Sequence, residues 1–169
     1  MNVDKEIWDQ AFLPGFWANI QAYQTAKHPF LKKKLKETIK RTLYKWTDLP
    51  PTWVSTEIIR IFEENGISKN PFDLIYPDRK TLGYNENKRT IMLWEHTTPM
   101  NEMYQSLVKC KSPEEVAEVM KSYSGVCWIT RDEDTRLNKN GHRANREGGW
   151  KKVYGDCGIN VIDRNQYGK

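Results

Sequence analysis

Residues 89–97 (RTIMLWEHT) carry the strongest β-strand signal in the chain and decide its fold class. The stretch is apolar and rich in β-branched and aromatic residues, which favour strands, and Pro99 ends it. A second strand is expected at residues 125–129 (GVCWI), a short apolar run between two predicted helices. Strands therefore alternate with helices, which predicts an α+β or α/β fold with a small mixed sheet of three to five strands.

A helical N-terminal layer is expected before this sheet. Residues 4–12 and 16–26 have amphipathic patterns and are separated by a Leu-Pro-Gly segment, and a third helix fits residues 55–65. The clearest helix covers residues 30–46, where four aliphatic side chains recur at every fourth position: Leu31, Leu35, Ile39 and Leu43. The chain is thus expected to be a single domain, 1–169, with a helical layer at 1–68 and an α/β core at 69–169.

Helix-start signals organise the second half of the chain. Ser112 and Glu115 form a predicted capping box with a proline between them, and Thr130 with Glu133 forms another. These signals predict helices at about residues 113–123 and 131–140. A further helix is expected at residues 100–110, and the tail is expected to hold a short helix and a final extended piece.

Composition narrows the classes of function. The 169 residues include 27 Lys and Arg against 22 Asp and Glu, which gives a net charge of +5 and permits a polyanionic partner. No apolar run approaches the ~18 residues of a membrane-spanning helix, so no membrane partner is expected. The three cysteines are widely spaced, which favours reduced thiols in the cytoplasm over a disulfide framework or a zinc site.

Two carboxylates are placed where a metal site could form. Asp78 follows a short apolar run at residues 72–76, which is expected to be a strand, and Glu95 lies near the end of the 89–97 strand. If these strands form a hairpin, the two acidic groups can hold Mg²⁺, which prefers oxygen ligands. Such an ion activates water and offsets charge on a phosphodiester. A shared ion would require the two carboxyl groups to lie within about 6 Å of each other.

The order Pro77-Asp78, then Glu95-His96-Thr97, then a helix and a further strand, resembles the PD-(D/E)XK superfamily of restriction-endonuclease-like nucleases. The resemblance covers about residues 72–130. It implies a Mg²⁺-dependent nuclease in which Asp78 and Glu95 are catalytic metal ligands. Thr97 stands where the family has a lysine, so the resemblance leaves that role to another lysine or to His96.

Glu95-His96-Thr97-Thr98-Pro99 also resembles the first motif of HNH nucleases, in which the histidine is the general base. The next histidine, His142, lies too far along the chain for that family's second motif. In a regular strand Glu95 and Thr97 share one face and His96 the other. A packed, hydrogen-bonded histidine at the strand end is therefore the alternative for His96.

Two segments are candidates for binding nucleic acid. Residues 27–45 hold eight Lys or Arg residues against Glu37 alone, and the candidates on the helix are Lys33, Lys36 and Lys40. The alternatives for this helix are a merely solvated face or a membrane-surface helix. The second segment, residues 136–152, combines cations and asparagines with Trp150 after two glycines. Its candidates are Arg143, Arg146, Trp150 and Lys151, and the alternative for Trp150 is a core anchor.

The sequence thus leads to two hypotheses of function. The first is a Mg²⁺-dependent endonuclease acting on DNA, with Asp78, Glu95 and His96 at its site. The second is a non-catalytic nucleic-acid-binding or inhibitor module of the kind found in phages and mobile elements. A homodimer is compatible with either hypothesis.

Overall fold

The chain forms two compact units, each built from two segments of sequence. A computed structural model describes residues 5–123 and 125–167. Unit 1 comprises Met1–Asp48 and Met100–Ser124, and unit 2 comprises Leu49–Pro99 and Gly125–Lys169. The chain therefore crosses between the units three times. Within the described residues, no helix combines the length and the apolar character that a membrane span requires.

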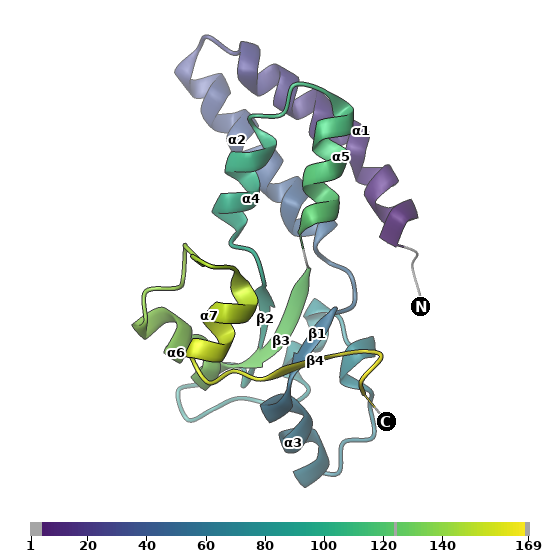
Figure 1. Ribbon diagram of the computed structural model, residues 1–169, viewed down its shortest axis with the longest axis vertical. Helices are drawn as coiled ribbons and strands as arrows, with labels where there is room; N and C mark the ends of the chain where they lie inside the picture. The colour runs from purple at the N-terminus through teal and green to yellow at the C-terminus, as the bar shows by residue number, and fades with distance from the viewer. Residues whose placement is uncertain (1–4, 124, 168–169) are drawn as a thin grey trace. The chain divides into compact units, whose positions relative to one another are not determined.

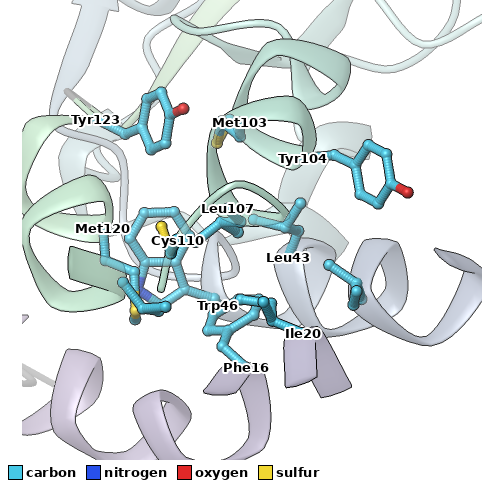
Figure 2. Packing of buried hydrophobic residues seen from close by; sticks show 12 residues of the cluster. Phe16, Ile20, Leu43, Trp46, Met103, Tyr104, Leu107, Cys110, Met120 and Tyr123 are labelled. Atoms are coloured by element: carbon cyan, nitrogen blue, oxygen red, sulfur yellow. The ribbon is translucent and has the colours of Figure 1, made fainter. Parts of the chain in front are cut away.

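Unit 1 is helical (Figure 1), and its buried residues form one hydrophobic core. Its helices are α1 (Lys5–Thr25), α2 (Pro29–Trp46), α4 (Met100–Leu107) and α5 (Pro113–Ser122). Figure 2 shows Phe16 and Ile20 of α1 and Trp46 of α2 facing the side chains of α4 and α5. The helix predicted at 30–46 is confirmed, with His28 as its N-cap and Pro29 at its first position.

Helix α1 corrects the predicted break at residues 13–15. The helix continues through Pro14, although proline has no N–H to donate to the preceding turn. The apolar face is continuous across this position, because Trp8 and Phe12 before it and Phe16 and Ile20 after it all pack on the same core. Packing of that face offsets the loss of one backbone hydrogen bond.

Unit 2 contains a four-stranded mixed sheet with the strand order β2-β3-β1-β4. The strands are β1 (Trp53–Ser55), β2 (Met92–His96), β3 (Val126–Thr130) and β4 (Val161–Asp163). Strands β1 and β3 are parallel, whereas β2 pairs with β3 and β4 pairs with β1 in antiparallel fashion. This sheet and the N-terminal helices confirm the predicted α+β class with a small mixed sheet and a helical N-terminal layer.

The two faces of the sheet carry separate hydrophobic clusters. Helix α3 (Thr56–Glu64) packs on the face of Val54, Met92 and Trp128. Helices α6 (Arg131–Lys139) and α7 (Trp150–Asp156) pack on the opposite face, where Leu93, Cys127 and Ile129 lie. Side chains that alternate along β2 and β3 therefore enter different clusters.

Two elements differ from the expectation. Strand β1 lies within 1–68, the predicted helical layer, where no strand was expected, and it is only three residues long. The run at 72–76, expected to be a strand, instead covers the end of one 3₁₀ helix, η1 (Pro71–Asp73), two residues outside regular structure, and the start of another, η2 (Tyr76–Lys80). Pro71 and Pro77 begin or nearly begin these turns and cannot donate to a sheet ladder, so the predicted hairpin with β2 was wrong.

Candidate functional site

The structure does not bring Asp78 and Glu95 together. Tyr76 of η2 packs edge-on against Trp94, with ring centroids 6.4 Å apart, so η2 lies against the Trp94 face of β2. The side chain of Glu95 points to the other face, as alternation along the strand requires. Asp78 caps its own turn, where its Oδ2 accepts the backbone N–H of Ile75 at 2.9 Å.

The Mg²⁺ pair expected of Asp78 and Glu95 therefore has no geometric support. Among residues 5–123 and 125–167, no three His, Cys, Asp or Glu side chains gather in a way that could hold a metal ion. The hairpin that would have joined the two carboxylates is missing because η2 replaces its first strand.

Glu95 instead forms a buried ion pair with Arg146. Nη2 of Arg146 donates to Oε1 of Glu95, while Nη1 donates to the backbone carbonyls of His96 at 2.8 Å and Thr97 at 2.6 Å. The Arg146 side chain is only 3% exposed, and its guanidinium lies over the ring of Tyr154. Burial raises the pKa of the Glu95 carboxyl, and the positive charge of Arg146 opposes that rise.

This pairing changes the role predicted for Arg146. Its guanidinium is buried and donates to three acceptors within the protein, so it cannot also donate a bidentate pair of hydrogen bonds to a phosphate or a base edge. It ties the segment before α7 to the end of β2, about fifty residues earlier in the chain. Arg146 is therefore a structural residue of unit 2 and not a surface contact for nucleic acid.

His96 lies at the same strand end and has a strongly perturbed imidazole. Burial, and to a smaller extent the charge of Arg146, lower its pKa from 6.5 to about 4. A general base works best when its pKa is near the working pH, so this histidine is poorly matched to catalysis near neutrality. Its environment fits the alternative of a packed histidine held neutral at the end of β2.

His96 predicts a dependence of stability on acid. The unfolded chain binds a proton at this residue below its ordinary pKa of 6.5, whereas the folded chain binds it only near pH 4. The free energy of unfolding should therefore fall as the pH is lowered from 6.5 towards 4, by up to about 3 kcal/mol from this group. Urea denaturation of the wild type and of His96→Gln across this range measures the effect.

The difference between these two proteins isolates the histidine, because Glu95 and Glu133 titrate in both. A wild-type minus variant difference that stays constant between pH 6.5 and 4 would contradict the low pKa. A difference that shrinks as the pH falls is the expected result.

Trp150 and Lys151 belong to an aromatic cluster on the α7 side of the sheet. The Trp150 ring lies 5.2 Å from that of Trp53 and 5.2 Å from that of Tyr154. The ammonium group of Lys151 lies over Trp53, 4.9 Å from its ring centroid. Trp150 is thus a partly buried anchor of α7, which agrees with the alternative reading, while Lys151 and Arg143 are exposed.

A cleft of about 580 Å³ opens where the parallel strands β1 and β3 end. Ser55 caps α3 and Thr130 caps α6, and these helices leave the two strands towards opposite faces of the sheet. Glu133 joins the two strand ends, because its Oε2 accepts both the Ser55 hydroxyl at 2.8 Å and the Thr130 N–H at 2.7 Å. The cleft is lined by both acidic and basic side chains, including Asp132 and Arg131.

The sequence predicted the contact between Thr130 and Glu133 at this cleft but not the contact between Glu133 and Ser55. The capping box of Thr130 and Glu133 was recognisable and is confirmed. The link from Glu133 to Ser55 joins residues 78 positions apart, and burial of the carboxyl raises its pKa. The one available signal was Ser55 directly before a helical pattern, which marks an N-cap but not its distant partner.

The basic helix α2 carries the largest concentration of like charge. Residues 27–45 hold eight cations and one carboxylate. Eight positive charges minus one negative charge give this segment a net charge of +7, which exceeds the +5 of the whole chain. The rest of the protein is therefore slightly acidic. Residues 27–34 are all exposed, and among the large apolar side chains Phe30 is 63% and Leu31 50% exposed.

Lysines of α2 have few acidic partners. In the described part of the chain, the ion pairs on this helix are Lys34 with Glu37 and Lys45 with Asp48, both exposed. The ammonium groups of Lys36 and Lys40 lie over the Tyr104 ring of α4, at 5.4 and 5.5 Å from its centroid. Of the predicted candidates, Lys33 and Lys36 are exposed and Lys40 is partly buried.

Comparisons with models of protein families, with curated proteins and with solved structures found no match to this chain.

Proposed function

We propose that the protein binds nucleic acid through helix α2, without needing the predicted metal site. The observation that carries the proposal is the localisation of charge, since the net positive charge of the protein resides in residues 27–45. Phosphate contacts are made mostly by Lys and Arg and supply the sequence-independent part of affinity. An exposed helix with several cations and little acidic compensation has the properties of such a contact surface.

The test replaces Lys33, Lys36 and Lys40 together by alanine. Affinity for nucleic acid of any sequence should fall by about tenfold or more at low salt, because three phosphate contacts are lost. The slope of log K against log salt should become shallower by about 2.7. Fluorescence anisotropy with labelled oligonucleotides at several salt concentrations measures both quantities.

A matched control removes the same charge elsewhere in unit 1. Lys109, Lys111 and Lys121 are exposed, and their replacement by alanine also lowers the net charge by three. This control should change the affinity much less than the α2 variant. Equal losses in the two variants would mean that only overall charge matters, and unchanged affinity in the α2 variant would refute the proposal.

The nuclease hypothesis makes a separate prediction that the same protein can test. Nicking of plasmid DNA that requires Mg²⁺ and disappears in Asp78→Asn and Glu95→Gln would support it. Binding without cleavage is the outcome expected here, because the Asp78 carboxylate caps its own turn and the Glu95 carboxylate is paired with Arg146.

A further inference from the structure

The cations of α2 form two rows on either side of an exposed ridge. Successive residues of an α-helix are rotated by about 100°, so positions spaced by three, four or seven residues share a side. The first row consists of Lys33, Lys36 and Lys40, and the second of Lys34, Arg41 and Lys45. Between the rows runs the ridge of Phe30, Glu37 and Tyr44, which recur every seven residues.

The ridge faces away from the core of unit 1. Ile39, Leu43 and Trp46 lie on the opposite side of the helix and are buried against α1 and the α4–α5 pair. Phe30 is 63% and Tyr44 56% exposed at the two ends of the ridge. The ridge therefore lies on the side of helix α2 that faces away from the core, and a row of cations runs along each side of it.

We infer that the nucleic acid bound by α2 is B-form double-stranded DNA, with α2 in its major groove and one cationic row against each backbone; this rests on the proposed function. One row of cations suffices to follow one phosphate backbone. Two rows, separated by a ridge, match the two backbones that border a groove. The major groove of B-DNA is about 12 Å wide, and an α-helix with its side chains is about 10–12 Å across.

Other nucleic acids fit this arrangement less well. The major groove of A-form RNA is deep and narrow and does not admit a helix. A single strand is bound mainly by stacking on neighbouring aromatic rings, whereas Phe30 and Tyr44 are separated by about 21 Å of helix. The ion pairs of Lys34 with Glu37 and of Lys45 with Asp48 are exposed, so they are weak and can exchange their carboxylates for phosphates.

The experiment compares four probes at matched salt: a DNA duplex of about two helical turns, one of its strands, the RNA duplex of the same sequence, and vesicles containing phosphatidylserine. The DNA duplex should bind at least about tenfold more tightly than the single strand or the RNA duplex. Three variants are compared with the wild type. In one the three cations of the first row are replaced by alanine, in another those of the second row, and in the control Lys109, Lys111 and Lys121 are replaced by alanine.

Both row variants should flatten the salt dependence for the DNA duplex by similar amounts, about 2.7 in slope, and the control should not. Circular dichroism verifies that each variant keeps its helix content. Equal affinity for the single strand or the RNA duplex, or sensitivity to the first row alone, would overturn groove binding but leave nucleic-acid binding standing. Failure to bind any nucleic acid would overturn both, and row-dependent vesicle binding would then assign the surface to a membrane.

Discussion

Replacing Arg146 by methionine is expected to lower the free energy of unfolding by about 3–5 kcal/mol, because removal of one partner of a buried ion pair leaves the other charge uncompensated. In this variant Glu95 would remain in β2 but would no longer be paired with the guanidinium of Arg146. The carbonyls of His96 and Thr97 would also lose donors at 2.8 and 2.6 Å. Urea denaturation followed by tryptophan fluorescence measures the loss.

Arg143→Met is the matched control for this prediction. Arg143 lies three residues earlier in the same segment and is exposed, so its replacement should change stability by no more than about 0.5 kcal/mol. A second variant, Arg146→Met with Glu95→Leu, removes both charges and should recover part of the loss. If Arg146→Met cost no more than Arg143→Met, the ion pair would not be holding this segment to β2.

Local signals predicted much of the secondary structure. The apolar strand at 92–96, the capping box of Thr130 and Glu133, and the basic helix all depend on residues within one or two turns of each other, and each is present. At the start of α5 only half of the predicted box forms: Ser112 accepts the N–H of Glu115, whereas the Glu115 carboxylate accepts the N–H of Lys111. The surface charge of α2 was equally readable, since it needs only the count of lysines and the side on which the aliphatic residues lie.

The prediction of an acidic pair depended on distant pairing, and the structure does not bring Asp78 and Glu95 together. The hairpin joining Asp78 to Glu95 required a strand at 72–76, and apolar character alone does not distinguish a strand from a 3₁₀ turn between two prolines. The true partner of Glu95, Arg146, lies 51 positions away, and no local pattern connects them. Strand alternation did anticipate that Trp94 and Glu95 would face opposite sides.

The central strand of unit 2 owes much of its stability to Trp128, which is fully buried. Its ring lies 4.7 Å from that of Trp94 in an edge-on contact, and its backbone lies between Val54 of β1 and Trp94 of β2. Trp128→Ala should reduce the free energy of unfolding by about 3–5 kcal/mol, because the cavity left in the hydrophobic cluster between the sheet and α3 cannot fully collapse. Urea denaturation measures this loss, with Tyr84→Ala as a control at an exposed aromatic residue of the same unit.

A phenylalanine at position 128 separates packing from hydrogen bonding. The indole N–H of Trp128 is buried and has no hydrogen-bond partner among the described residues, so Trp128→Phe removes an unsatisfied donor along with part of the ring. Trp128→Phe should therefore cost clearly less than Trp128→Ala, since the ring contact with Trp94 is kept. Equal losses for Phe and Ala would instead show that the stability comes from what both variants lack, the indole N–H and the part of the indole ring that phenylalanine does not replace, and not from the ring contact with Trp94.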